Sequence, residues 1–346
     1  MGDKSRIPLL PPKIFPVENG IERPLWSVMI PCFNNSKTLG KTIKSVLSQD
    51  QGEIAMQIMV VDDHTADQGK IKEIVNKTGN GRVGFFSQQK NVGSLRNFET
   101  CLNLSKGFII HILHADDYVH PGFYNKMAHL LETYPQAGAA FCHYYLVDEK
   151  SNKLSEASLQ QEKAGILPDW LVRIARAQQI QVPAMVVRRE VYEKLGAFHS
   201  VIYGEDWEMW VRIAAHYPVA YLPETLASYR VHTGSISGRT IRSGQNVRDL
   251  RRVINLIQRY LPREEKQKAK KIASKYYSGL AMETAEELIS TGDDQAARAQ
   301  IFEAMRLYPQ WKFIKKAAPK YFKTFSSHSN GNTGSLKKQK NSIHQL

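Results

Sequence analysis

Two short apolar runs of this chain, residues 58–61 and 108–113, are each followed within a few residues by a pair of adjacent aspartates. A third acidic pair opens a segment with helical periodicity. The three pairs are Asp62 with Asp63, Asp116 with Asp117, and Glu205 with Asp206. Adjacent carboxylates at the tip of a buried strand are costly unless something cationic holds them. We therefore expect one polar site, built from these pairs on an α/β scaffold.

Apolar runs alternate with helical segments through the first 113 residues. Strands are expected at 27–30, 54–61, 83–86 and 108–113, and helices at 39–47, around 71–75 and at 98–104. This β-α-β-α-β-α-β order predicts a mostly parallel, Rossmann-like sheet with helices on both faces. Ligands of such sheets bind outside the carboxyl ends of the strands, where two of the acidic pairs lie.

The pattern becomes more mixed after residue 120. Helices are expected at 121–134, from 189 and at 205–216, and strands at 139–147 and 180–187, with a further short strand within 219–230. Residues 148–163 are polar and predict a loop or an edge hairpin. Residues 233–246 are rich in Gly, Ser and Arg and predict a mobile loop, and 247–318 have helical periodicity.

The charge of the chain separates its two ends. Of the net charge of +14, residues 241–346 hold 21 Lys and Arg against 9 Asp and Glu, whereas residues 1–240 hold 26 against 24. A basic segment favours an anionic partner, either membrane lipid or nucleic acid. We expect four parts: an irregular leader (1–24), an α/β domain (25–240), a basic α-helical C-terminal region (241–325) and a disordered tail (326–346).

The composition is that of an ordinary globular protein. The three cysteines lie far apart without metal-ligand spacing, so we expect them to be reduced and buried. There is no run of 18 apolar residues and no signal-like apolar stretch at the start. We therefore expect a cytoplasmic protein, peripheral to the inner face of the membrane if its basic region binds lipid.

Six motifs occur in an order that resembles the family 2 glycosyltransferases with the GT-A fold. They are residues 27–34, 60–67, 91–97, 114–117, 204–212 and 228–232. The resemblance covers roughly residues 25–240. It implies an inverting enzyme of polysaccharide biosynthesis that moves a sugar from a nucleotide-diphosphate sugar, a UDP-sugar, to a glycan or lipid-linked saccharide acceptor.

The resemblance also implies roles for individual residues. The nucleotide-sugar donor would contact Pro31, Phe33, Asp62, Asp63, Asn91, Arg96 and Asp116. Asp117 and His232 would bind a divalent cation, Mn²⁺ or Mg²⁺, that neutralises the diphosphate as the sugar leaves. Asp206 would be the general base that deprotonates the acceptor hydroxyl, and Glu205 would orient the acceptor or the base.

Plainer interpretations accompany several of these roles. Asp62 could only cap the turn that follows it, and Arg96 could form a structural ion pair. Glu205 and Asp206 could merely stabilise the start of a helix through its dipole. His114 stands where many members of the family carry the first aspartate of the metal motif. This departure keeps open an alternative, a catalytically inactive relative that binds glycans or nucleotide sugars.

Two other classes of protein are disfavoured. A nucleotidyltransferase of the same fold would carry a Gly-rich, basic loop after the first strand, which residues 31–37 lack. No motif for base readout accompanies the basic C-terminal region, so no nucleic-acid partner is expected. Within residues 311–325 aromatic side chains alternate with lysines. This pattern predicts peripheral contact with an anionic membrane, or alternatively an amphipathic helix that closes the core.

Overall fold

The computed structural model describes residues 6–232 and 234–326. It divides into two compact units, one of residues 1–170 with 179–230 and the other of residues 171–178 with 231–346. The first five residues of the expected leader, and all but the first residue of the expected tail, lie outside the described residues. The four-part division of the chain stays a prediction.

A mixed, mostly parallel sheet organises the first unit. Its strands are β1 (Trp26–Cys32), β2 (Met56–Asp62), β3 (Gly84–Ser87), β4 (Ile109–Ile112), β5 (Tyr118–Val119), β6 (Ala139–Val147), β7 (Lys153–Glu156), β8 (Gly165–Ile166), β9 (Met185–Arg188) and β10 (Val219–Arg230). Within the described residues the order is β3-β2-β1-β4-β9-β6-β10-β5, with β7 beside β6 and β8 beside β10. The predicted α/β fold class is confirmed.

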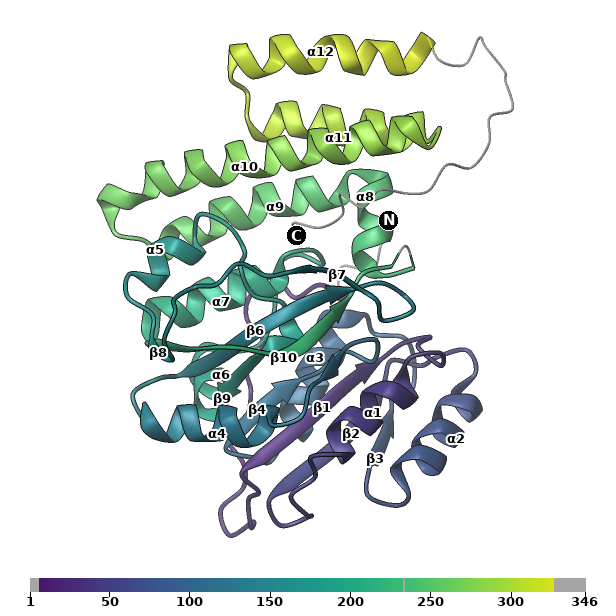
Figure 1. Cartoon of the computed structure of the whole chain (residues 1–346), viewed down its shortest axis with the longest axis vertical. Coiled ribbons are helices and arrows are strands. Elements are labelled where there is room, and N and C mark those ends of the chain that lie inside the picture. The colour runs from purple at the N-terminus through teal and green to yellow at the C-terminus, as the bar shows by residue number, and fades with distance from the viewer. Residues whose placement is uncertain (1–5, 233, 327–346) are drawn as a thin grey trace. The chain divides into compact units, whose positions relative to one another are not determined.

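Helices flank this sheet. They are α1 (Leu39–Leu47), α2 (Gln68–Gly79), α3 (Ser94–Leu104), α4 (Phe123–Thr133), α6 (Arg189–Leu195) and α7 (Glu205–His216), and the chain passes between the units within α5 (Trp170–Ile174). Helices α1 and α2 pack together on one face of the sheet, and α3 lies on the other face against β1, β2 and β4 (Figure 1). The helices that follow β1 and β2 therefore cover one face of the sheet, and the helix that precedes β4 covers the other.

The strand order reverses between β1 and β4. Strand β1 pairs in parallel with both β2 and β4, and the register sets Cys32 beside Asp62. In open α/β sheets a ligand binds at such a reversal of strand order, outside the carboxyl ends of the strands. The aspartate pairs that follow β2 and β4 both lie at this edge of the sheet.

Strand β9 begins later than the sequence pattern predicts. The sequence pattern predicts a strand over residues 180–187, but β9 begins at Met185 and runs antiparallel to both β4 and β6. Pro183 lies in a short 3₁₀ turn, Val182–Ala184, immediately before it. A proline has no N–H to donate to the ladder, so the strand can begin only after it.

The segment predicted as a mobile loop, residues 233–246, contains a helix instead. Helix α8 spans Ile236–Ser243, and the Ser235 hydroxyl accepts a hydrogen bond from the Gly238 N–H at 3.1 Å. Gly244, at a φ of +68°, ends the helix in the left-handed conformation. Ser235 and Gly244 are ordinary helix-capping residues, so the Gly- and Ser-rich composition hid two capping signals.

The second unit is a stack of helices. It contains α8, α9 (Gln245–Leu256), α10 (Arg263–Ser290), α11 (Asp294–Leu307) and α12 (Trp311–Ser326). Helix α11 packs against both α10 and α12 (Figure 1). The buried core of this stack consists of Ala285, Ala297, Ile301 and Ala317, and its three alanines allow the helices to pack closely. None of the helices in the described part of the chain combines the length and apolar character that crossing a bilayer requires.

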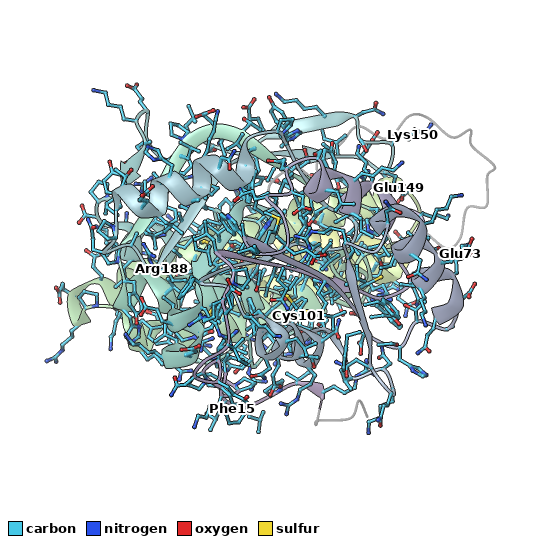
Figure 2. The ribbon with its side chains drawn as sticks, turned by 90° about the horizontal axis from the view of Figure 1, so that it is seen from below. Phe15, Glu73, Cys101, Glu149, Lys150 and Arg188 are labelled. Carbon is cyan, nitrogen blue, oxygen red and sulfur yellow. The ribbon has the colours of Figure 1, made fainter. Side chains whose placement is uncertain are left out.

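The three cysteines are free and buried, as predicted. Cys101 lies inside the first unit, whereas Glu73 and Glu149 project at its periphery (Figure 2). Burial is the main reason that the pKa values of the Cys32 and Cys142 thiols are raised to about 12. These thiols stay protonated at neutral pH and serve as core packing groups rather than nucleophiles.

Gly107 marks a close approach of two backbone segments. A Cβ at this position would lie 2.5 Å from the Ser27 nitrogen and 2.5 Å from the Trp26 carbonyl carbon. At Gly279, in the middle of α10, a Cβ would have no neighbouring atom within 4 Å beyond the helix's own backbone. The two glycines therefore respond to the same substitution in opposite ways.

We predict that Gly107→Ala lowers the free energy of unfolding by about 1–3 kcal/mol, because the backbone of β1 cannot move aside cheaply. Gly279→Ala should raise it by about 0.5–1 kcal/mol through helix propensity. Urea unfolding midpoints of the two variants and the wild type measure both effects. Equal midpoints for the two variants would contradict the packing described at Gly107.

Candidate active site

The turn that follows β4 carries a deeply buried acid, Asp117. Asp117 is 1% exposed, and its N–H donates to the His114 carbonyl at 3.1 Å. Its Oδ1 accepts a hydrogen bond from the Arg230 N–H at 2.8 Å. Its Oδ2 has no hydrogen-bond partner among the described residues. A buried carboxylate oxygen without a donor is costly, so this atom is suited to a cation.

Electrostatics agree with that interpretation. Burial raises the pKa of Asp117 well above its usual range, and the neighbouring Asp116 raises it further. The closest cationic candidate, His114 Nδ1, lies 3.7 Å from Asp117 Oδ2, beyond hydrogen-bond distance. Burial lowers the pKa of His114, so its imidazole is neutral at physiological pH and can act as a metal ligand.

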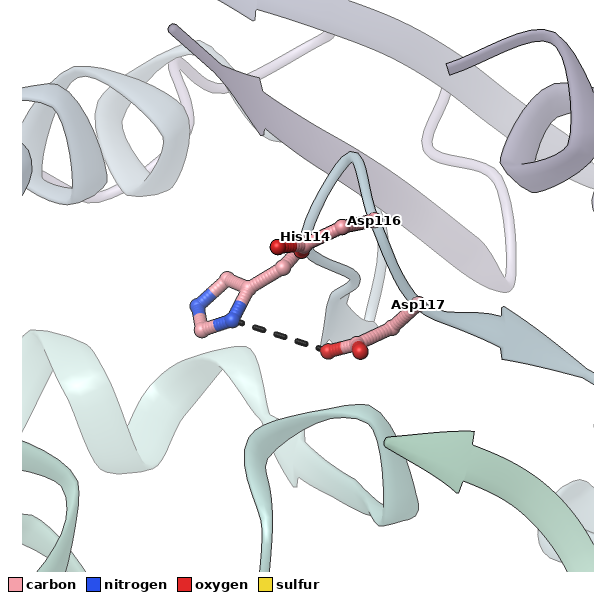
Figure 3. A group of neighbouring side chains, drawn as sticks. All are labelled: His114, Asp116 and Asp117. Carbon is pink, nitrogen blue, oxygen red and sulfur yellow. Dashed lines mark ion pairs between the residues drawn. The ribbon is translucent and has the colours of Figure 1, made fainter. Parts of the chain in front are cut away.

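His114 completes a group that can hold a metal ion. One ligand atom from each of His114, Asp116 and Asp117 lies within 4.8 Å of the others (Figure 3). The His114 ring stacks on Phe98 of α3, with ring centroids 5.5 Å apart, and its Nε2 is buried without a hydrogen-bond partner among the described residues. Because His114 Nδ1 faces the unsatisfied Oδ2 of Asp117 (Figure 3), these two ligand-type atoms fit a shared divalent cation.

His114 was not among the predicted ligands. The available signal was its position two residues before Asp116, where a histidine replaces the first aspartate of an Asp-x-Asp pattern.

Two distant elements hold this acidic turn in place. The Thr42 hydroxyl of α1 lies 3.0 Å from the Ala115 carbonyl oxygen and 2.7 Å from that of Asp117. From the end of β10, Arg230 Nε donates to the Asp116 carbonyl at 2.8 Å, and its Nη1 donates to the Asp148 carbonyl at 2.7 Å. The Arg230 guanidinium thus joins two loops to one another.

Asp62, at the end of β2, is fully buried and turned toward its own loop. Its Oδ2 accepts from the Thr65 N–H at 2.9 Å, and its Oδ1 accepts from the Thr65 hydroxyl. These contacts match the plainer interpretation that Asp62 caps the turn after β2.

Asp63 binds the loop that enters α3. Its carboxylate accepts from the Val92 N–H at 2.7 Å, the Gly93 N–H at 2.9 Å and Asn91 Nδ2 at 2.8 Å. Burial raises the pKa of Asp63, while the two backbone amides and the charge of Arg6 act in the opposite direction. The structure therefore brings together two of the predicted donor residues, Asp63 and Asn91.

A cavity of about 410 Å³ lies beside this loop. It is lined by Arg6, Gln88, Lys90, Asn91, Val92, Arg96, Glu99 and Thr100. Arg96 forms an ion pair with Glu99 at 2.7 Å. Arg6, from the leader, donates to the Asn91 side-chain carbonyl. The sequence analysis missed Arg6, because nothing local marks a leader residue that joins a loop 85 positions away.

Two other predicted donor residues flank the end of β1. Pro31 is buried within the strand, whereas Phe33 is 37% exposed just beyond it. Phe33 is therefore the one of the pair that offers a surface to a ligand at this edge of the sheet.

The third acidic pair opens α7. Gly204, at a φ of +82°, precedes the helix, and Glu205 and Asp206 lie in its first turn. Asp206 is 8% exposed, and its Oδ1 accepts a hydrogen bond from the Trp207 N–H at 2.7 Å. Trp207 and Trp210 are buried, so both pack in the core of the unit.

Packed rings link α7 to the acidic turn. The Phe98 ring, which stacks on His114, contacts Phe198 edge-on at 5.4 Å between centroids, and Phe198 contacts Trp210 at 6.1 Å. The acidic turn and α7 thus share one aromatic core. His232 lies two residues beyond Arg230 and within the second unit, so its role as a metal ligand stays a prediction.

Comparison with known proteins identifies the family. The model of glycosyl transferase family 2 matches residues 27–196. Residues 27–196 of the chain belong to glycosyl transferase family 2. An uncharacterized glycosyltransferase of Methanocaldococcus jannaschii is 26% identical to this glycosyltransferase over 216 residues, which cover 61% of this chain and 72% of the relative.

Two staphylococcal proteins extend the comparison. The Staphylococcus aureus poly(ribitol-phosphate) beta-N-acetylglucosaminyltransferase TarP is 36% identical over 97 residues, which cover 27% of this chain and 29% of TarP. The structure of S. aureus TarS residues 1–349 in complex with UDP-GlcNAc matches with a TM-score of 0.61 at 17% identity. That match covers 88% of this chain and 91% of that chain. The predicted GT-A fold is thereby confirmed for this glycosyltransferase.

A buried ion network stiffens α7 next to Asp206. Glu208 is fully buried, 3.0 Å from Arg212 Nη2 and 3.3 Å from His199 Nε2. Arg212 in turn donates to the Ala197 carbonyl at 3.0 Å. Removing the carboxylate would leave a buried guanidinium with no counter-charge in this network.

We predict that Glu208→Ala lowers the free energy of unfolding by about 3–5 kcal/mol. The matched control is Glu224→Ala, which removes the acid of the exposed Lys126–Glu224 pair and should cost less than about 1 kcal/mol. Chemical denaturation followed by circular dichroism measures both. A Glu208→Ala variant as stable as the control would show that the network contributes little.

Proposed function

We propose that this glycosyltransferase transfers a sugar from a UDP-sugar to a hydroxyl of a glycan or lipid-linked saccharide, with inversion at the anomeric carbon. The observation that carries the proposal is the buried, unsatisfied Oδ2 of Asp117, one of three ligand-type groups at the switch point of the sheet. A diphosphate leaving group needs a positive charge beside it, and the Asp117 turn has the ligand-type groups to hold a cation.

A divalent cation fits this group, and His114, Asp116 and Asp117 would hold it. When bound, such an ion neutralises the negative charge that develops on the diphosphate. An imidazole nitrogen in the ligand set favours a transition metal such as Mn²⁺ over Mg²⁺, which prefers oxygen ligands alone.

Binding of the donor would use the loops beside β1 and β2. Asp63 and Asn91 form a polar edge suited to the hydrogen-bonding edge of uracil, and Phe33 offers an exposed ring beside it. Arg96 lines the neighbouring cavity and could meet donor phosphates if its pair with Glu99 opens. Pro31, Asp62 and Asp116 shape and support these loops. UDP-GlcNAc is the first donor to test, because TarS was crystallised with it.

Asp206 is the proposed general base. Its carboxylate accepts the proton of the acceptor hydroxyl while that oxygen attacks the anomeric carbon and the bond to the UDP oxygen breaks. A single displacement of this kind inverts the anomeric configuration. Glu205, on the same helical turn, orients the acceptor. Burial of Trp207 and the Glu208 network keep this turn rigid, which helps the base to hold its position.

The replacement of an aspartate by His114 favours one alternative, an inactive relative that binds nucleotide sugars without turnover. Donor binding and catalysis must therefore be measured separately. The variant of Asp206 tests catalysis, and the variant of Asp117 tests binding of the donor with its metal.

We predict that Asp206→Asn lowers kcat about 10²- to 10⁴-fold, because the amide cannot accept the acceptor proton. The dissociation constant for UDP-GlcNAc should stay within about threefold of wild type. Release of UDP with a panel of saccharide acceptors and calorimetric donor binding measure the two quantities. A wild-type protein that binds the donor but releases no UDP with any acceptor would support the inactive relative instead.

We predict that donor binding by the wild type is strengthened by Mn²⁺ and falls to a weak, metal-independent level in excess EDTA. Asp117→Ala should abolish this metal dependence, leaving residual binding equal with Mn²⁺ and with EDTA. Glu73→Ala, which removes an exposed acid of α2, is the matched control and should behave as wild type. Retention of Mn²⁺-dependent binding in Asp117→Ala would overturn the assignment of this turn.

A further inference from the structure

Helix α12 has a basic and aromatic outer face. It carries Lys312, Lys315, Lys316, Lys320 and Lys323 and no acidic residue. Its other side packs on the helical core: Ala317 and Thr324 are buried, and Phe313 and Tyr321 contact the cluster around Ile301. Closure of the core therefore uses only one side of the helix, and the opposite side faces solvent.

Large aromatic side chains lie on that solvent-facing side. Trp311 is 70% exposed, Phe322 is 66% exposed and Phe325 is 58% exposed. Trp311 and Phe322 are eleven residues apart, which is about three helical turns, so they share one face. Exposed aromatics of this size in a row are costly in water and mark a surface that binds something.

Lysines border these rings. Among the described residues, no hydrogen bond or ion pair engages the side-chain ammonium of Lys312, Lys315 or Lys316. Lys320 pairs with Glu286 of α10. On the α11 side, Arg298 lies 4.7 Å from the Phe325 ring centre and donates to the Thr324 carbonyl at 2.8 Å. The face formed by Trp311, Lys312, Lys315, Lys316, Phe322 and Phe325 is called the α12 outer face below.

Negative charge is scarce in this part of the chain. Glu303 is the last acidic residue of the sequence, and it is 3% exposed and paired with Arg248, Arg251 and Arg306. A second copy of the α12 outer face would bring lysines against lysines, so self-association through it is disfavoured. An anionic surface that also accepts aromatic rings would match both the lysines and the exposed rings of the α12 outer face.

We infer that the α12 outer face docks on the surface of an anionic lipid bilayer. Its rings would enter the boundary between headgroups and acyl chains, and its lysines would meet lipid phosphates. The helix would lie along the surface, since none of the described helices can cross a bilayer. This inference rests on the second unit alone and stands whatever sugar the enzyme transfers.

Trp311 supplies a built-in reporter. The other four tryptophans, Trp26, Trp170, Trp207 and Trp210, are at most 4% exposed, so a change in emission on lipid binding must come from Trp311. The full-length chain is mixed with vesicles of phosphatidylglycerol and phosphatidylcholine, or of phosphatidylcholine alone. Sedimentation gives the partition coefficient, and the emission maximum gives the environment of the ring.

We expect binding to the anionic vesicles alone, a blue shift of emission, and weakening above about 0.1 M salt. Lys312→Glu with Lys315→Glu and Lys316→Glu should lower the partition coefficient at least about 100-fold, because each lysine near such a surface contributes roughly fivefold. Phe322→Ala should lower it about tenfold. Trp311→Phe should abolish the shift while leaving most of the binding.

Two matched controls separate this face from general charge and general exposure. Lys268→Glu with Lys270→Glu and Lys271→Glu makes the same charge change on exposed positions of α10, and Phe108→Ala removes a 52% exposed ring of the first unit. Both should retain wild-type partitioning. Thermal unfolding and donor binding check that every variant is folded.

Absence of wild-type binding to anionic vesicles would overturn the inference, as would an equal loss in the α10 and α12 lysine variants. Binding without a shift in Trp311 emission would also contradict it. A wild type that ignores vesicles but binds duplex DNA, or that dimerises through α12, would assign the face to another partner.

Discussion

The buried carboxylate of Asp117 is the constraint on which the site depends. An ionised acid with so little exposure is stable only when each of its oxygens has a partner, and among the described residues one oxygen is left without one. The turn cannot relieve this by swinging outward, because Thr42 and Arg230 hold its backbone from α1 and β10. The fold thus keeps a carboxylate oxygen without a hydrogen-bond donor near the point between β1 and β4 where the strand order reverses.

The same packing relates this atom to the proposed base. The rings of Phe98, Phe198 and Trp210 form a continuous core from His114 to α7. Glu208 and Arg212 fix the helix just beyond Asp206. The candidate metal ligands, His114, Asp116 and Asp117, and the proposed base therefore belong to one compact unit. This is what a displacement reaction requires, since small errors in position between donor and acceptor are expensive.

The sequence predicted those parts that depend on local periodicity. Strand β6 at Ala139–Val147 and helix α7 at Glu205–His216 have the expected bounds, because strong apolar patterns define them. Strand β10 at Val219–Arg230 fills the whole range in which only a short strand was predicted. The antiparallel direction of β9 could not be predicted, since pairing partners far apart in the chain decide it.

The site residues that local sequence marks were also predicted, whereas those that long-range contacts bring in were not. The acidic pairs were found because they are adjacent in sequence and follow apolar runs. Thr42, Arg6 and the backbone N–H of Arg230 were not found, because each acts across 75 or more positions. The hydrogen bonds from the Val92 and Gly93 amides to the Asp63 carboxylate could not be predicted either, because only folding brings these residues together.

The most direct test of this account is a crystal of the enzyme grown with UDP and Mn²⁺ and measured at the manganese absorption edge. The account predicts one strong anomalous peak within coordination distance of the Asp117 carboxylate, with UDP beside the carboxyl end of β1. A crystal with UDP bound but no manganese at Asp117, or with manganese held by other residues, would contradict the central claim.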